Sequence, residues 1–201
     1  MKRLILASAA LAVLALPVLA LPVAALAQSG PRKPAPAPAP APPPPSRPDG
    51  PDCAAQGPLP ATWSGEAYVA DGNTIVGVGL KAPIRLWGVQ APELRDAAKA
   101  ETVPGMRARA TLQDLLDRAD HKLKCRPIRF DRDCRIVAHC TVNDALGGDI
   151  GSGLIAAGMA YGIDLNETLA FEPHAGQRYA TAEAEARKQR RGLWKEWLGE
   201  K

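Results

Sequence analysis

The chain has 201 residues, of which 25 are Lys or Arg, 21 are Asp or Glu, 20 are Pro and 4 are Cys. Eleven of the prolines lie between Pro31 and Pro51 and the first 27 residues are mostly apolar, which leaves about 150 residues for a folded part. That size corresponds to one domain with an ordinary hydrophobic core, and it excludes a large multidomain protein.

Residues 1–27 predict a secretory signal peptide. Lys2 and Arg3 precede a long apolar run, and the small residues at 25–27 are typical of a signal peptidase site. An uncleaved membrane anchor is the alternative because the run is long enough to span a bilayer, but its two prolines and its small-residue ending favour cleavage. We therefore expect an exported protein, periplasmic or extracellular, with no stable membrane contact after cleavage.

Residues 28–51 predict a disordered linker rich in Pro and Ala. Alternating Pro-Ala favours an extended polyproline II spacer without a core of its own. Five basic residues and one acid precede Pro51, so the remaining domain, residues 52–201, has 20 basic and 20 acidic residues. The net charge of +4 belongs to the leader and linker and is no evidence for a nucleic-acid partner.

Charge is nevertheless segregated along the domain. Residues 81–135 carry thirteen basic and eight acidic side chains, whereas residues 136–177 carry five acids and no Lys or Arg. Such segregation can produce a basic face on a neutral body, and solvated charges that never cluster in space are the alternative.

The domain opens with three predicted strands. Period-two patterns and turn residues place them at residues 63–70, 74–78 and 83–89. Apolar residues at helical spacing then predict a helix from Met106 to Ala119, with Pro104 near its first turn, where a missing N–H costs little.

A hairpin follows, with strands at residues 123–130 and 135–142. Its register, with Phe130 opposite Arg135 and Ile128 opposite Val137, sets Cys125 opposite Cys140 and predicts a cross-strand disulfide in an oxidising compartment. Cys53 and Cys134 are left, either as a second pair or as free thiols. A zinc site is disfavoured because no C-x-x-C occurs.

Two further helices are predicted at residues 150–160 and 176–190, while residues 52–62 and 165–175 resist assignment. The order strand, strand, strand, helix, strand, strand is that of the OB barrel. We therefore expect an α+β fold, a five-stranded Greek-key barrel with about three helices.

Four short motifs occur in the domain in a fixed order. They are D-G-N-T at 71–74, I-R-L-W-G-V-Q-A-P-E at 84–93, D-R-D-C-R-I-V-A at 131–138, and Y-A-T-A-E-A-E-A-R-K-Q-R-R-G-L-W at 179–194. Together they resemble the thermonuclease family, the staphylococcal-nuclease-like domains, from residue 65 to residue 194. The resemblance implies the same barrel and the hydrolysis of phosphodiesters in single-stranded DNA or RNA.

The resemblance assigns catalysis to Arg85, Glu93 and Arg135. Charge accumulates on phosphate oxygens during in-line attack, and a guanidinium is a permanently charged fork that can meet two of them. A carboxylate beside the attacking water can orient it and take its proton. Taken singly, the arginines are ordinary surface charges and Glu93 is a carboxylate at a helix N-terminus; the motifs favour the catalytic interpretation.

Two positions depart from the family pattern. The family implies calcium held by aspartates where this chain has Asn73 and Gln90, with Asp71 as an outer ligand. Amides keep an oxygen ligand but lose the charge, and opposite charges about 4 Å apart attract by about 4 kcal/mol at an effective dielectric near 20. We therefore expect calcium to be bound weakly or not at all.

Three functions remain open from the sequence. The first is an exported endonuclease of the thermonuclease type, and the second is a catalytically degenerate OB module that binds nucleic acid or a partner in the cell envelope. The third is a structural role in the cell envelope, for which only the leader and the spacer argue. We expect a monomer.

Overall fold

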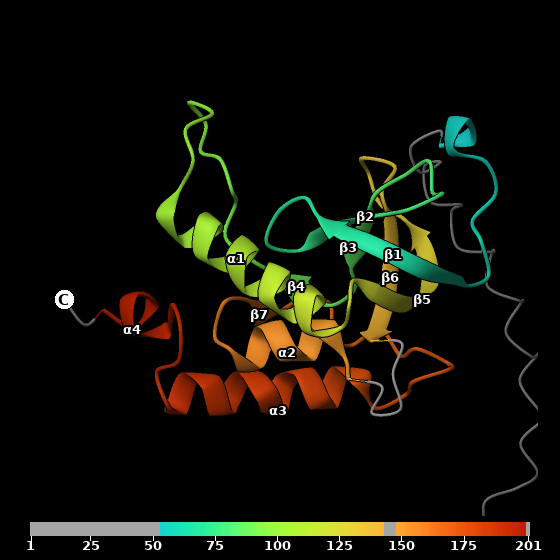
Figure 1. Ribbon diagram of the computed structural model, residues 1–201. Coiled ribbons are helices and arrows are strands. Elements are labelled where there is room, and N and C mark those ends of the chain that lie inside the picture. Colours follow the sequence, from blue (N-terminus) through green and yellow to red (C-terminus); the bar gives the residue numbers. More distant parts are fainter. Residues whose placement is uncertain (1–52, 143–147, 200–201) are drawn as a thin grey trace, which may run out of the picture. The chain divides into compact units, whose positions relative to one another are not determined.

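Five strands close into a barrel in the computed structural model (Figure 1). β1 (Trp63–Val69) pairs antiparallel with β2 (Thr74–Gly77) and with β5 (Lys122–Phe130). β2 continues antiparallel to β3 (Ile84–Leu86), which runs parallel to β6 (Ile136–Val142), and β6 closes the barrel against β5. The order β1-β2-β3-β6-β5 confirms the predicted OB-type barrel.

The structure describes residues 53–142 and 148–199, all within one compact unit. The predicted signal peptide at 1–27 and the linker at 28–51 lie outside the described residues. Within the described ranges, no helix combines the length and apolar character that crossing a membrane requires.

α1 (Val103–Arg118) lies between β4 and β5 in the chain and packs on the barrel (Figure 1). Its start follows the predicted signals, because Thr102 caps it by accepting a hydrogen bond from the Gly105 N–H at 3.1 Å, and Pro104 stands in the first turn. The buried face repeats at helical spacing through Ala108, Leu112 and Leu116.

α2 (Ile150–Ala156) and α3 (Ala175–Lys188) pack against each other beside α1 (Figure 1). Both occur where helices are predicted, although α2 ends four residues earlier because the chain turns at Gly158 with a positive φ of 71°. Three short elements are additional: the 3-10 helix η1 (Ala54–Gln56), α4 (Trp194–Trp197) and the two-stranded sheet of β4 (Val89–Gln90) and β7 (Tyr161–Gly162).

The third predicted strand, residues 83–89, is therefore two strands. β3 ends at Leu86, and β4 leaves the barrel to pair with β7. Trp87, at the break, is only 1% exposed and is among the largest buried side chains of the core. All four residues from Leu86 to Val89 are buried, so the sequence stays apolar across the break and gives no sign that the strand ends there.

The β5–β6 hairpin corrects one predicted register and confirms another. Cys125 does lie opposite Cys140, and the two form the expected disulfide with Cα atoms 4.1 Å apart. Nearer the tip the pairing shifts by one, so that Arg129 faces Val137 and Phe130 faces Ile136. The predicted pairs of Ile128 with Val137 and of Phe130 with Arg135 are wrong, because a β-bulge at Ile128 adds one residue to β5.

A second disulfide joins Cys53 to Cys134, with Cα atoms 5.4 Å apart. It resolves the alternative that the sequence left open, and free thiols are excluded for both residues. Cys134 stands at the tip of the β5–β6 hairpin with a positive φ of 56°. The bridge therefore fastens the first described residue of the domain to that tip.

Candidate functional site

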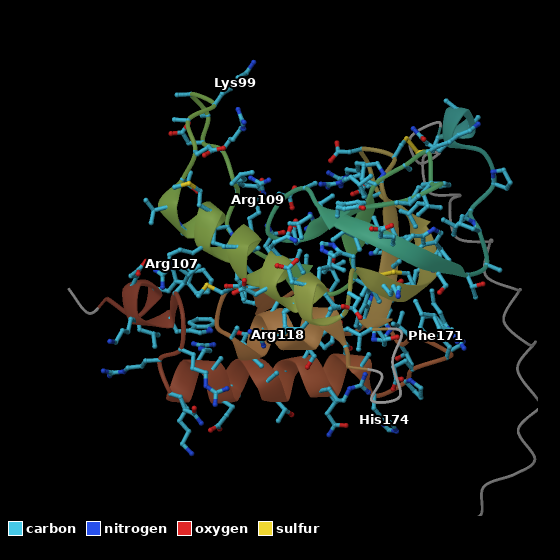
Figure 2. All side chains as sticks on the ribbon, in the orientation of Figure 1. Lys99, Arg107, Arg109, Arg118, Phe171 and His174 are labelled. Atoms are coloured by element: carbon cyan, nitrogen blue, oxygen red, sulfur yellow. A yellow bond between two sulfur atoms is a disulfide. The ribbon has the colours of Figure 1, made fainter. Side chains whose placement is uncertain are left out.

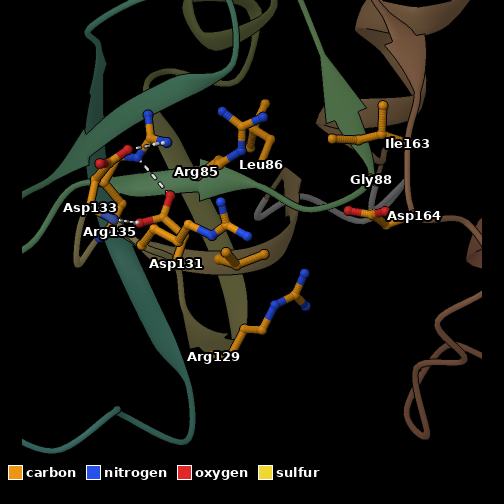
Figure 3. Close-up of a pocket in the computed structure, with 11 residues that line it drawn as sticks. Arg85, Leu86, Gly88, Arg129, Asp131, Asp133, Arg135, Ile163 and Asp164 are labelled. Atoms are coloured by element: carbon orange, nitrogen blue, oxygen red, sulfur yellow. Dashed lines mark hydrogen bonds and ion pairs between the residues drawn. The ribbon is translucent and has the colours of Figure 1, made fainter. Parts of the chain in front are cut away.

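A hollow of about 360 Å³ lies at the tip of the β5–β6 hairpin, beside β3 (Figure 3). Its wall is mostly charged, and we call it the arginine pocket. The lining residues are Arg85, Leu86, Gly88, Arg129, Asp131, Arg132, Asp133, Arg135, Val137, Ile163 and Asp164. Two of the three residues to which the resemblance assigns catalysis, Arg85 and Arg135, thus share one pocket although they are fifty positions apart.

Arg85 is held in the middle of β3, where its backbone pairs with Thr74 of β2 and Val137 of β6. Because β2 and β6 flank β3 on both sides, the Cα position of Arg85 is fixed, and its side chain is half-buried. Its Nη2 donates a hydrogen bond of 2.7 Å to Oε1 of Gln90. The amide at position 90 therefore orients the guanidinium group of Arg85.

Arg135 is positioned by Asp131, four residues earlier. One carboxylate oxygen of Asp131 accepts hydrogen bonds from the backbone N–H groups of Asp133 and Arg135 at 2.9 Å each. The other accepts from Nε of Arg135 at 2.7 Å, and Asp133 adds an ion pair at 3.1 Å (Figure 3). The first and last residues of the D-R-D-C-R turn thus form one unit that sets the direction of the Arg135 side chain.

Arg129 reaches the pocket from β5 and is tied to the loop between β7 and α3. Its Nη1 donates to both carboxylate oxygens of Glu167, at 2.6 and 2.8 Å, and Trp87 Nε1 donates to the same carboxylate at 2.9 Å. Glu167 therefore joins that loop to the barrel. Arg132 has no ion pair with any residue that the structure describes.

The D-G-N-T turn packs against the segment after β4. A Cβ atom added to Gly72 would lie 2.8 Å from the Cβ of Ala91 and 2.9 Å from that of Ala108, so only glycine permits this approach. Asp71 and Asn73 close the turn through an N–H to carboxylate hydrogen bond of 2.9 Å, and Asn73 is only 6% exposed. The predicted metal-site residues thus come from two segments that are adjacent in space.

Glu93 lies at the base of the loop that precedes α1. Its carbonyl accepts a hydrogen bond of 2.6 Å from the Thr102 hydroxyl, and a Cβ on Gly105 would lie 2.3 Å from the same oxygen. The helix begins ten residues later, at Val103, so the interpretation of Glu93 as a carboxylate at a helix N-terminus is wrong. Its side chain is exposed and is not among the residues that line the arginine pocket.

The oxygen atoms available for a cation near this site are few. Oε1 of Gln90 accepts from Arg85, and its Nε2 donates to the Ala91 carbonyl at 2.9 Å. Oδ1 of Asp71 accepts from the Asn73 N–H. Among the residues that the structure describes, no three His, Cys, Asp or Glu side chains form a group suited to a metal ion.

A buried polar network supports the other end of β6. Asp149 accepts hydrogen bonds from the Tyr179 hydroxyl at 2.8 Å and the Ser152 N–H at 3.0 Å, and its carboxylate lies 2.8 Å from Nε2 of His139. Burial raises the pKa of Asp149, but His139 and these donors outweigh it and hold the pKa below its ordinary value. Burial, followed by the charge of Asp149, raises the pKa of Tyr179.

Much of the acidic segment 136–177 is thereby neutralised. Glu167 pairs with Arg129, Glu172 pairs with Arg178 at 2.7 Å, and Asp149 is also 3.5 Å from Arg178. The fold thus brings three of the four described acids of this segment onto Arg129 and Arg178, whereas Asp164 forms no ion pair with a described residue.

A closed OB-type barrel that places an arginine from β3 and an arginine from the β5–β6 turn on one polar pocket has the features of a nuclease-like OB-fold protein. In agreement, residues 83–196 match the family described as Staphylococcal nuclease homologue. The match covers more than half of the chain, so the chain belongs to this family. No curated protein matches the sequence.

The motifs predict the two arginines that share the pocket but not the groups that hold them. Asp131 is part of the D-R-x-x-R motif, and its i, i+4 spacing from Arg135 is the signal for their contact. Glu167 and Arg129 carried no such signal, because they lie 38 positions apart and meet only through the tertiary fold.

Proposed function

We propose that the protein is an exported nuclease-type phosphodiesterase that binds the backbone of single-stranded DNA or RNA in the arginine pocket. Domains of this family bind nucleic acid generally. The observation that supports the proposal is the presence of Arg85 and Arg135 in one hollow of about 360 Å³. The two disulfides are compatible with an oxidising compartment outside the cytoplasm.

The chemistry assigned to the pocket is electrostatic. Each guanidinium offers five N–H donors, and the bonds to Gln90 and to Asp131 and Asp133 leave further donors for phosphate oxygens. Because these bonds fix both side chains before a ligand arrives, little reorganisation accompanies the charge that develops on the phosphate. In this proposal Glu93 orients the attacking water and takes its proton, the role of its position in the family.

We also propose that calcium is held weakly or not at all. The residues at the family's metal positions do not fit a tight site, because Asn73 and Gln90 are neutral and the side-chain oxygen of Gln90 is already an acceptor for Arg85. Loss of two carboxylate charges from a divalent site should weaken binding by orders of magnitude. No catalytic step is therefore assigned to a metal ion here.

The test is cleavage of single-stranded DNA and RNA by the purified domain in calcium, magnesium, manganese or a chelator. We expect cleavage that Arg85→Ala, Arg135→Ala and Glu93→Gln each reduce by about a hundredfold or more, with binding weakened by the arginine variants only. An exposed basic residue outside the pocket, Lys81, supplies the control variant Lys81→Ala. Absence of cleavage under all four conditions would exclude the enzymatic part of the proposal.

Binding without hydrolysis is the second candidate function. It is favoured by the exposed Glu93 side chain, which does not line the arginine pocket, and by the bond between Gln90 and Arg85. The double variant Asn73→Asp with Gln90→Asp distinguishes the two. Activity that appears only in the double variant identifies the natural protein as a binding module. Cleavage by both proteins supports a hydrolase that does not need aspartates at positions 73 and 90.

A further inference from the structure

A second hollow, of about 180 Å³, lies further along the β5–β6 hairpin. It is lined by two side chains from each of three segments, and we call it the lateral pocket. These are Lys124 and Arg126 of β5, His139 and Thr141 of β6, and Phe171 and Glu172 of the loop before α3.

The lateral pocket and the arginine pocket lie in line on one face of the hairpin. The cross-strand pairs along this face are Arg129 with Val137, then Arg126 with His139, then Lys124 with Thr141. Residues two apart on β6 share a face, so Val137, His139 and Thr141 point the same way. The four steps along the strand from Val137 to Thr141 span about 13 Å at the usual strand rise.

The bulge at Ile128 is what brings Arg129 onto this face. Lys124 and Arg126 are two residues apart and share a face directly, but Arg129 is three residues beyond Arg126 and would point to the opposite side of a regular strand. The extra residue restores the alternation, and Arg129 lines the arginine pocket. A single row of cations thus connects the two pockets.

One loop walls both pockets. Ile163 and Asp164, at the start of the connection from β7 to α3, line the arginine pocket, and Phe171 and Glu172, near its end, line the lateral pocket. Figure 2 shows Phe171 on this loop, close to His174 at the start of α3. The hairpin and this loop therefore contribute to both hollows, and β3 contributes to the arginine pocket as well.

The lateral pocket carries uncompensated positive charge. Among the described residues, neither Lys124 nor Arg126 forms an ion pair. The acidic member of the lining, Glu172, is paired with Arg178 at 2.7 Å, and the imidazole of His139 is occupied by Asp149 at 2.8 Å. Two cations are left to attract an anion.

The pocket also offers a flat π surface. The guanidinium of Arg126 lies 5.0 Å from the centre of the Phe171 ring, and the His139 ring lies 6.0 Å from it on a tilted plane. Bases of single-stranded nucleic acids stack on phenyl rings and guanidinium planes without requiring a particular sequence. A nucleotide carries a negatively charged phosphate and a flat base, so it is complementary to cations that lie beside such a surface.

We propose that the lateral pocket is a second nucleotide subsite, which holds a nucleotide of the same strand beyond the two that are linked by the phosphate in the arginine pocket. Lys124 and Arg126 contact its phosphate, and its base stacks on the Arg126 and Phe171 pair. The volume of about 180 Å³ is below the size of most pockets for drug-sized ligands and suits part of one nucleotide. This inference rests on the proposed function of the arginine pocket.

The experiment compares two probes with phosphorothioate backbones, which resist cleavage: a labelled thymidine dinucleotide and an oligo-dT of about 4–16 nucleotides, the range bound by single OB folds. Affinities are measured by fluorescence anisotropy at several salt concentrations. The variants are Lys124→Ala, which alters an exposed side chain, and Phe171→Leu, which keeps an apolar side chain but removes the ring. Lys122→Ala is the matched control, because Lys122 is exposed on the same strand but outside the pocket.

We expect the wild-type protein to bind the longer probe more tightly than the dinucleotide. Lys124→Ala should weaken binding of the longer probe and lower its logarithmic salt slope by about 0.7, the value for one phosphate contact on a single strand. Phe171→Leu should weaken it by about fivefold or more without lowering the slope. Neither variant should change the affinity for the dinucleotide, and Lys122→Ala should change neither affinity.

The inference is overturned if both probes bind the wild-type protein equally well, or if Lys124→Ala has no larger effect than Lys122→Ala. Thermal unfolding checks each fold, and Lys124→Ala tests the pocket even if Phe171→Leu destabilises the loop. Failure of the proposed function has a different signature. In that case, Arg85→Ala with Arg135→Ala leaves dinucleotide binding unchanged, whereas failure of the lateral subsite alone leaves that binding dependent on both arginines.

Discussion

Asp131 shows how one carboxylate can organise a hairpin tip and the side chain next to it. It accepts three hydrogen bonds at the hairpin tip, two from backbone N–H groups and one from Arg135. The spacing in the D-R-x-x-R motif follows from this geometry, since a shorter or longer turn would separate the carboxylate from the guanidinium. The motif therefore encodes a local structure as well as a charge.

Asp131→Ala should lower the free energy of unfolding by about 1–3 kcal/mol, because it removes the acceptor for three donors at a half-buried turn. Asp133→Ala is the matched control. Its carboxylate is 73% exposed and contributes one ion pair, so the expected change is within about 0.5 kcal/mol. Urea unfolding of both variants measures the difference, and equal effects would contradict the role given to Asp131.

Asp149 should make the fold sensitive to acid. Its pKa in the folded protein lies below the ordinary value of 3.8, so the unfolded chain binds the proton more readily. The stability that this carboxylate contributes is therefore present above pH 3.8 and is lost as the pH falls toward the folded pKa.

Asp149→Asn tests this effect. The variant should be less stable by about 1–3 kcal/mol at neutral pH, because the amide is a poorer acceptor for His139 and Tyr179. It should also lose less stability than the wild-type protein when the pH falls from neutral to below about 4. Urea unfolding across that range gives both quantities, and parallel pH profiles for the two proteins would refute the assignment.

At the scale of elements, the sequence predicts the barrel well because four of its strands alternate or carry clear turn signals. The third predicted strand and the hairpin tip are the exceptions. Trp87 and its neighbours stay buried while the chain leaves the barrel, so tertiary packing decides the backbone path there. The bulge at Ile128 does have a local signal, because Pro127 precedes it and proline within a paired strand is typical of a bulge.

Glu167 should control the order of the loop between β7 and α3. Glu167→Gln weakens the paired bonds to Arg129 and the bond from the buried Trp87 N–H. The ion pair is partly exposed and is worth at most about 1 kcal/mol, so the main effect should be local. We expect faster amide hydrogen exchange at residues 163–174 and unchanged exchange in the barrel strands.

Trp87→Phe separates the two contributions to this loop. It removes the N–H donor but keeps the ring in the core and leaves Arg129 bound to Glu167. The amide hydrogens of residues 163–174 should therefore exchange more slowly in Trp87→Phe than in Glu167→Gln. Equal protection of residues 163–174 in the wild-type protein and Glu167→Gln would show that the carboxylate does not hold the loop.

At the scale of the whole molecule, the two disulfides should differ in how readily they are reduced. Cys125 and Cys140 are 0% and 2% exposed, whereas Cys53 and Cys134 are half-buried. Mild reductant should therefore open the Cys53–Cys134 bridge first. Alkylation and mass mapping after partial reduction check this order, and earlier labelling of Cys125 would reverse it.

Removal of either disulfide should also lower the free energy of unfolding. In the loop-entropy account, a bridge across 81 positions stabilises by about 4.5 kcal/mol and one across 15 positions by about 3 kcal/mol. The double variant Cys53→Ser with Cys134→Ser should therefore cost about 4.5 kcal/mol in unfolding free energy. The corresponding Cys125 and Cys140 variant should cost at least as much, because it also buries two hydroxyl groups in the apolar core.

The family and the barrel could be predicted from the sequence because motifs and alternation are local. The arginines of the site were accessible for the same reason. Residues 165–175 could not be assigned, since the loop takes its shape from contacts such as Glu167 with Arg129 and Glu172 with Arg178. Nor could the partner of Cys53 be chosen, because 81 intervening residues must fold before the two thiols meet.

That long-range bridge also gives the polypeptide an unusual connectivity. Residues 53–134 form a covalent macrocycle that contains the first five strands and α1, while α2 and α3 lie outside it. An extracellular protease that nicks the exposed loop at residues 95–99 would open the ring without releasing a fragment. The damaged molecule would run at its full mass on a non-reducing gel and separate into two pieces only after reduction.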